Sequence, residues 1–243
     1  MDRFDFFQQL SRRYPGSITF TSAYLTPLPL DRYSRVAEVG CGNGHRVSWV
    51  SRSRCCELIA IDKESRHLER TYQRAEEGGS SGLVQLRQVE NYSSLPLEEQ
   101  SVDLIIAEEA SFEIDFIEAL KRWRKYVRPG GHITVTPMGV VNRHPPNEVT
   151  DRWQKLRGSA LESLEDYHQQ LSGLGLKLVH QVQLPAHEWE EHYMELDRYA
   201  KGLVTSGKAE DTDSTILEVY DEVAWFRRFG RGRVFLQAFV LEV

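Results

Sequence analysis

The sequence predicts an α/β fold in which a seven-stranded, mostly parallel sheet carries helices on both faces. Two observations support this prediction. Short apolar runs and helical stretches follow one another along the chain, and the apolar runs do not alternate polar and apolar residues, as half-buried strands would. Runs of this kind are typical of parallel strands that are buried on both faces.

Seven runs fit strands, and they account for the predicted sheet. They are Arg35–Val39, Glu57–Ile61, Leu83–Gln88, Val102–Ala107, His132–Thr136, Leu176–Gln183 and Val234–Leu241. Between the fourth and fifth strands, apolar residues recur at helical spacing from Phe116 to Val127. Pro129, Gly130 and Gly131 are expected to end this helix.

We expect one domain over residues 1–243, with three parts. A lid covers about residues 1–30, a core covers about 31–137, and the C-terminal half carries a cap insertion at about 185–232. Because roughly 50 residues join the last two strands, this connection is too long for a plain loop. Its pattern is helical and aromatic, which predicts a helical cap, and a shorter elaboration is expected at about 139–156.

The first predicted strand runs into the glycine-rich turn VGCGNGH, which contains Gly40, Gly42 and Gly44. Glycine is needed where a chain turns tightly or where a ligand touches the backbone. A helix is expected from Arg46, and Asp62 ends the second strand at the position where an acid receives ribose hydroxyls. This context predicts a Rossmann-like cofactor site.

Glu38, two residues before the first glycine, bears on which cofactor the turn binds. A pyrophosphate would meet this carboxylate unfavourably, whereas a sulfonium or an ammonium would be attracted to it. His45 also stands where the third glycine of the dinucleotide-binding pattern would fall. These residues favour S-adenosyl-L-methionine over a nicotinamide or flavin cofactor.

The segments VAEVGCGNG, NYSSLP, VDLIIAEEA and YVRPGGHITVT, together with Asp62, resemble the class I S-adenosylmethionine-dependent methyltransferase family. The resemblance spans roughly residues 15–137. It implies cofactor-binding roles for Glu38, Gly40, Gly42, Asn43, Gly44, Asp62, Lys63, Asn91 and Tyr92. Asn91 departs from the family's usual aspartate, although its amide oxygen can still accept a hydrogen bond from adenine.

A narrower resemblance concerns PGSITFTSAY, AEEASFEIDF and LPAHEWEEHY, which are similar to a bacterial subgroup of small-molecule methyltransferases. It implies a small acceptor beneath the cap. The candidate catalytic residues are Glu108 at the end of the fourth strand and His192 with Tyr193 in the cap, where Trp189 is expected to line the same pocket. His192 and its aromatic neighbours could equally pack a cap helix.

Glu109 is a second candidate base, although an acid at this position also suits a helix N-terminus. The histidines of the cap do not have a zinc-binding pattern, so no metal is expected. Since Cys41, Cys55 and Cys56 cannot form a disulfide framework, they fit a reducing compartment.

The formal net charge of −6 and the lack of an NPPY-type signature make nucleic acid a poor candidate substrate. No apolar run approaches the roughly 20 residues that span a bilayer. We therefore expect a soluble, cytoplasmic enzyme, monomeric or homodimeric, with no membrane partner. The alternatives are a protein or nucleic-acid methyltransferase and a nucleotide-dependent oxidoreductase.

Overall fold

The computed structural model describes residues 2–10, 12–108, 110, 114–157 and 161–243. The chain divides into two compact units, each built from three segments. The sheet unit consists of Ile18–Met138, Leu164–Gln183 and Leu236–Val243. The helical unit consists of Met1–Ser17, Gly139–Ser163 and Leu184–Phe235. The expectation of a single domain over residues 1–243 stays a prediction.

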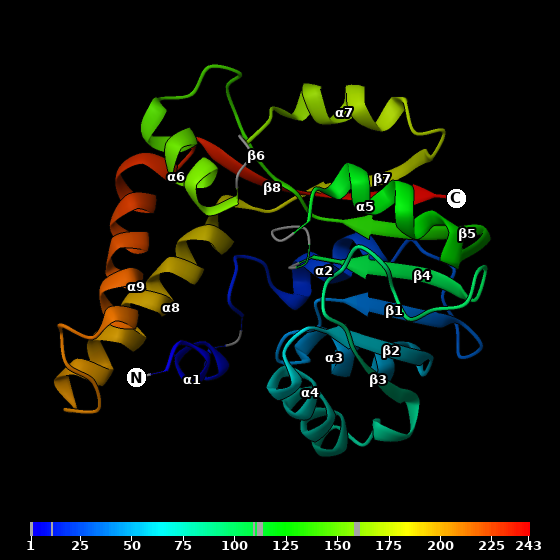
Figure 1. Cartoon of the computed structure of the whole chain (residues 1–243), viewed down its shortest axis with the longest axis horizontal. Helices are drawn as coiled ribbons and strands as arrows, with labels where there is room; N and C mark the ends of the chain where they lie inside the picture. The colour runs from blue at the N-terminus through cyan, green and yellow to red at the C-terminus, as the bar shows by residue number, and fades with distance from the viewer. Residues whose placement is uncertain (1, 11, 109, 111–113, 158–160) are drawn as a thin grey trace. The chain divides into compact units, whose positions relative to one another are not determined.

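All seven predicted strands are present. They are β1 (Arg35–Val39), β2 (Glu57–Asp62), β3 (Val84–Gln88), β4 (Val102–Ala107), β5 (Val127–Val135), β7 (Lys177–Gln183) and β8 (Val234–Glu242). Their order is β3-β2-β1-β4-β5-β8, and β7 pairs with β8 (Figure 1). The first five strands pair in parallel, whereas β8 is antiparallel to both β5 and β7. This is the predicted Rossmann-like, mostly parallel sheet.

The order of the strands places a switch point between β1 and β4. The chain proceeds outward from β1 to β2 and β3 on one side, and then returns to place β4 on the other side of β1. Ligands of open α/β sheets bind outside the carboxyl ends of the strands at such a point. Four of the five positions of β1 are buried, which explains why its sequence does not alternate.

The structure differs from the prediction in one short strand and in the end of one helix. The three-residue strand β6 (Met138–Val140) was not predicted, because three residues are too few to show a pattern. The helix α5 ends at Trp123, a 3₁₀ turn follows at Arg124–Tyr126, and β5 begins at Val127. The prediction that Pro129, Gly130 and Gly131 end this helix was therefore wrong, because all three lie within β5.

The α-helices described in the sheet unit accompany its strands (Figure 1). They are α2 (Ile18–Leu25), α3 (His45–Arg54), α4 (Ser65–Glu77), α5 (Phe116–Trp123) and α7 (Leu164–Ser172), with a 3₁₀ turn at Ser81–Leu83. The N-cap of α5 is Asp115, whose carboxylate accepts from the Glu118 backbone N–H at 2.9 Å. Because α2 belongs to this unit, the segment expected as a lid is divided at residue 17.

The helical unit gathers the segments that the sequence placed outside the cofactor core. Its helices are α1 (Arg3–Gln8), α6 (Asn147–Arg157), α8 (Ala186–Thr205) and α9 (Ser214–Trp225), followed by a π-helical turn at Phe226–Gly230. The connection between β7 and β8 is therefore helical, as predicted. Within this unit the Phe6 and Tyr199 rings lie 5.0 Å apart, which links α1 to α8.

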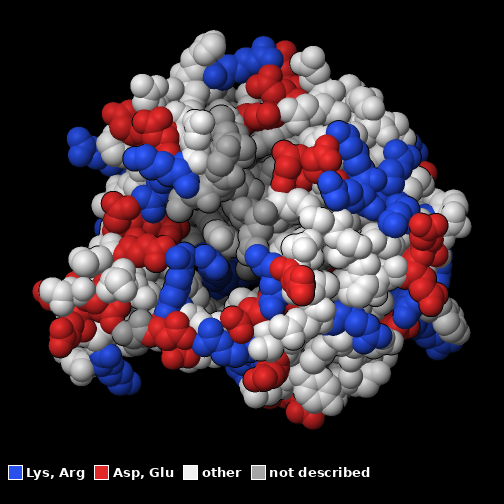
Figure 2. Space-filling model, viewed as in Figure 1, with Lys and Arg blue, Asp and Glu red and all other residues white. Residues whose placement is uncertain are grey.

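No helix among the described residues is both long enough and apolar enough to cross a membrane. On the face shown in Figure 2, acidic and basic side chains are intermixed. This pattern does not resemble the basic stripe with which proteins gather nucleic-acid phosphates.

Candidate functional site

The glycine turn after β1 has the backbone geometry that its sequence predicts. Gly40, Gly42 and Gly44 have φ angles of +72°, +51° and +75°, in the left-handed region that side chains disfavour. At Gly44 the space is also closed, because a Cβ would lie 2.6 Å from Thr71 Cα of α4. Glycine at this position therefore lets α4 pack directly against the turn.

Hydrogen bonds hold this turn to the end of β2. The backbone N–H groups of Gly40 and Cys41 both donate to the Ile61 carbonyl, at 2.8 and 3.2 Å. From α4, the Thr71 hydroxyl donates to the Gly42 carbonyl at 3.0 Å. The turn is thus fixed from two sides before any ligand binds.

Asp62 lies at the end of β2, as predicted, and is only 4% exposed. Its Oδ2 accepts from the Gly42 N–H at 2.9 Å, and its Oδ1 accepts from the Glu64 N–H at 3.0 Å. His67 Nδ1 lies 3.2 Å from the same Oδ1. Burial alone would raise the pKa of Asp62, but the hydrogen bonds and the charge of His67 together hold it below the ordinary value.

A buried ion-pair network joins β1 to the end of β4. Arg46, in the first turn of α3, donates to Glu38 Oε1 and to Glu108 Oε2, both at 2.9 Å. Glu108 Oε1 accepts hydrogen bonds from the Thr21 hydroxyl at 2.7 Å and from the Tyr24 hydroxyl. Two of the predicted acids are therefore brought together by one guanidinium.

Sequence reasoning missed the part that Arg46 plays in this network. The available signal was a basic residue two positions after the last glycine, in a chain with acids at the ends of β1 and β4. A buried acid needs a partner, because an uncompensated charge in a protein interior is costly. The exposed fractions of Glu38, Arg46 and Glu108 are 0%, 4% and 4%, so this requirement is strict.

Lys63 lies in the loop after β2, and Asn91 and Tyr92, the residues predicted to meet adenine, lie in the loop after β3. Lys63 Nζ lies 5.3 Å from the centre of the buried Tyr92 ring. The Tyr92 carbonyl accepts from the Trp123 indole N–H at 2.9 Å. Asn91 Oδ1 accepts from the Ser93 backbone N–H at 3.0 Å, so one acceptor position of this oxygen is already engaged.

The predicted cap residues lie on α8, within the helical unit. Trp189, His192 and Tyr193 are 5%, 7% and 3% exposed. Tyr193 stacks on Phe226, with ring centres 4.0 Å apart, and Trp189 stacks on the same ring at 5.8 Å. The two aromatic residues therefore pack the helices of the cap against each other, which agrees with the alternative that the sequence left open.

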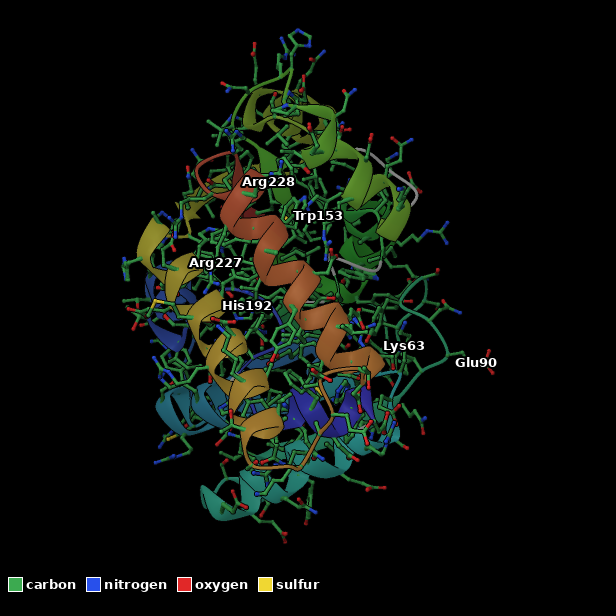
Figure 3. The ribbon with its side chains drawn as sticks, turned by 90° about the vertical axis from the view of Figure 1, so that its left-hand side faces the viewer. Lys63, Glu90, Trp153, His192, Arg227 and Arg228 are labelled. Carbon is green, nitrogen blue, oxygen red and sulfur yellow. The ribbon has the colours of Figure 1, made fainter. Side chains whose placement is uncertain are left out.

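His192, which is labelled on α8 in Figure 3, differs from its aromatic neighbours because an imidazole is polar. Its buried Nε2, and the buried Oε2 of Glu188 one turn earlier, have no hydrogen-bond partner among the described residues. Burial, and then the charge of Arg12, lower the pKa of His192 to about 3. At neutral pH its ring is therefore uncharged.

Glu222 on α9 is a second residue that sequence reasoning missed. It hydrogen-bonds to Tyr193, and burial raises the pKa of its carboxyl group despite the charges of Arg152 and Arg13. Burial and this acid also raise the pKa of Tyr193 well above its ordinary value. An acid beside Val223 on the apolar face of a helix was the available signal.

Glu108 belongs to the sheet unit, and the cap residues belong to the helical unit. Glu109 lies outside the described residues. Asn43, in the glycine turn, is half-buried. Within the described part of the chain, no group of three or more His, Cys, Asp or Glu residues is arranged to hold a metal ion.

Comparisons with known proteins agree with this geometry. Residues 37–135 match the family model of the methyltransferase domain. A methyltransferase from Thiobacillus denitrificans, solved with S-adenosyl-L-homocysteine, is 16% identical, with 100% of this chain and 99% of that chain covered and a TM-score of 0.82. A methyltransferase from Geobacter sulfurreducens, also solved with S-adenosyl-L-homocysteine, is 16% identical. The match covers 99% of this chain and 98% of that chain, with a TM-score of 0.80.

The YjhP protein of E. coli is 16% identical, with both chains fully covered and a TM-score of 0.82. No curated protein sequence matches the chain. At these identities the solved structures establish the fold, whereas the family match covers the glycine turn, Asp62 and β4 directly. Residues 37–135 therefore match a methyltransferase domain, and the described part of the chain has the Rossmann-like fold that the resemblance implied.

Proposed function

We propose that the protein transfers a methyl group from S-adenosyl-L-methionine to a small-molecule acceptor. The observation that carries this proposal is Asp62, a buried and ionised carboxylate bonded to the glycine turn at the carboxyl end of β2. Two of the similar solved structures contain S-adenosyl-L-homocysteine, the product of such a reaction. The matched domain supports the same activity.

Asp62 has a double role in this proposal. A carboxylate offers about four acceptor positions, and hydrogen bonds from Gly42, Glu64 and His67 engage three of them. The remaining position suits a ribose hydroxyl. The same acid would therefore order the turn and bind the cofactor.

The other cofactor roles follow the predicted assignment. The backbone of the glycine turn would hold the methionine part, Lys63 would stand beside Asp62 at the ribose, and Asn91 with Tyr92 would meet adenine. Glu38 and Glu108 are paired with Arg46, so we assign these acids an electrostatic and positioning role. Orientation of the reacting groups supplies roughly 7 to 11 kcal/mol in well-aligned systems, so positioning is a large part of this chemistry.

The proposed catalytic residues constrain the acceptor. Glu108 accepts two hydroxyl hydrogen bonds and an ion pair, which weakens it as a base. His192 is also a weak base, because burial lowers its pKa to about 3. We therefore propose an acceptor whose nucleophilic lone pair is free at neutral pH, with His192 and Tyr193 binding it. Such an atom needs no strong base to remove a proton.

A cytoplasmic location and a small acceptor are also part of the proposal. Among the described residues, Cys41, Cys55 and Cys56 are not joined in disulfides, as is usual in a reducing compartment. The formal charge of −6 opposes binding to nucleic-acid phosphates.

Methyl transfer from radiolabelled S-adenosyl-L-methionine tests the proposed function. The protein is incubated separately with a metabolite ultrafiltrate, with total protein and with total RNA from a bacterial lysate. We expect label in the metabolite fraction, and loss of that label in an Asp62→Ala variant. Label found only in protein or RNA would contradict a small acceptor, and no transfer to any fraction would contradict the methyltransferase activity.

A further inference from the structure

A groove on the sheet unit lies outside the glycine turn, between α3 and α4. It has a volume of about 610 Å³. Its lining residues are His45, Ser48, Trp49, Arg52, Ser53, Arg74, Glu77 and Gly78. All of them come from α3 or from the end of α4, and none carries a role in the proposed methyl transfer.

Arg74 is the residue in the groove whose hydrogen bonding is incomplete. Its Nε is shielded from solvent and has no acceptor among the described residues. Its Nη1 lies 2.7 Å from His45 Nδ1. Because a guanidinium can only donate, His45 accepts here with a neutral ring. A shielded donor without an acceptor is destabilising, so the guanidinium of Arg74 is held in this position at a cost.

Arg52 supplies a second guanidinium from the opposite wall. The path of its side chain depends on Gly78, where a Cβ would lie 3.1 Å from Arg52 Cδ and 3.0 Å from Ser48 Oγ. The absence of a side chain at Gly78 thus leaves room for Arg52 and for the Ser48 hydroxyl in the lining of the groove.

The charges around the groove favour an anion. Glu77 is the acid in the lining, and its carboxylate is paired with Arg70 at 3.2 Å. Burial, and then the charge of Arg70, lower the pKa of Arg74. The charged form of Arg74 is therefore destabilised in the groove as it stands, and a negative ligand would stabilise it.

We propose that this groove binds the oxyanion of a small molecule, a phosphate group, through Arg74 and Arg52. Guanidinium groups match the geometry of phosphate oxygens, and Ser48 adds a hydroxyl donor. The indole of Trp49 forms an apolar wall on which the rest of such a molecule can lie. The proposal is independent of methyl transfer, because it concerns other residues and is tested without cofactor.

Inorganic phosphate is the probe for this site. The full-length protein is labelled with ¹⁵N, and the indole resonance of Trp49 is assigned with a Trp49→Phe variant. Sodium phosphate and sodium chloride are titrated at matched ionic strength. We expect a saturable shift of this resonance with phosphate and none with chloride. Arg74→Gln and Arg52→Gln should each weaken phosphate binding by roughly tenfold or more, as the loss of a charge-assisted hydrogen bond implies.

The matched control is Arg66→Gln, which removes the same charge from α4 but lies outside the groove lining. We expect it to leave phosphate binding nearly unchanged. Equal weakening in all three variants, equal shifts with chloride, or no saturable shift would overturn the proposal. If Arg74→Gln does not fold, as judged by circular dichroism, the result for Arg52→Gln decides.

Discussion

The acids of the proposed cofactor site and two buried polar residues of the cap have different surroundings. In the sheet unit, Asp62 accepts from two backbone N–H groups, and Glu108 accepts from an arginine and two hydroxyls. In the helical unit, buried atoms of Glu188 and His192 have no partner among the described residues. The first arrangement is ready for a ligand before binding, whereas the second leaves donors and acceptors that a ligand could satisfy.

In the sheet unit, we expect the largest loss of stability when the charge that balances the buried acids is removed. Replacing Arg46 by methionine would leave the buried carboxylates of Glu38 and Glu108 without their guanidinium. We expect a loss of about 3–5 kcal/mol in the free energy of unfolding, measured by urea denaturation. The control is Arg35→Gln, which breaks the half-exposed pair with Glu57 at a cost of about 0–1 kcal/mol. Equal losses in the two variants would contradict the network.

The close approach of α4 to the glycine turn predicts the second largest loss of stability. Gly44→Ala combines a φ of +75° with a Cβ that would lie 2.6 Å from Thr71 Cα, so we expect a loss on the order of 3 kcal/mol. Gly79→Ala is the control, because Gly79 has a similar φ of +69° but nothing within 4 Å. It should cost only about 1 kcal/mol. Similar melting temperatures for both variants would show that the turn relaxes.

The buried His192 predicts a pH effect in the helical unit. Its pKa falls from an ordinary 6.5 to about 3 on burial, so the unfolded chain binds a proton that the folded protein does not. Stability contributed by this residue is present above pH 6.5 and is lost as the pH falls towards 3. Between pH 7 and pH 5 the loss should be about 2 kcal/mol. His192→Gln should flatten this dependence, and an unchanged pH profile would contradict burial of a neutral ring.

The smallest effect concerns Tyr193. Tyr193→Phe keeps the stack on Phe226 and removes the hydroxyl that bonds to Glu222. We expect a loss of about 1 kcal/mol in stability and unchanged affinity for S-adenosyl-L-homocysteine. A calorimetric titration checks the affinity. Weaker cofactor binding with unchanged stability would move Tyr193 from the packing of the cap to the cofactor site.

The same contrast explains how much the sequence could predict. The strands and the glycine turn were predictable because their signals are local: continuous apolar runs, glycines at required positive φ angles, and an acid at a strand end. Arg46 and Glu222 were missed because their partners are distant in sequence. Nothing near Arg46 indicates that it pairs with Glu108, 62 positions later, since only the register of β1 beside β4 brings the two acids together.

In the cap, the sequence predicted the helix but not the residues against which it packs. The sequence predicted a helical, aromatic cap that contains Trp189, His192 and Tyr193, and all three lie buried on α8. Periodicity reports which side is buried but not what it is buried against. The stacking on Phe226 depends on how α9 returns beside α8, which no local pattern in either helix specifies.

Isothermal titration calorimetry with S-adenosyl-L-homocysteine and with NAD tests the central claim most directly. The account predicts that S-adenosyl-L-homocysteine binds with one-to-one stoichiometry and that NAD does not bind. It also predicts that Asp62→Ala, in a variant that remains folded, weakens this binding by roughly 1–3 kcal/mol, the cost of losing a charged acceptor. Binding of NAD with no response to S-adenosyl-L-homocysteine would contradict the assignment of the glycine turn to a methyl-donor cofactor.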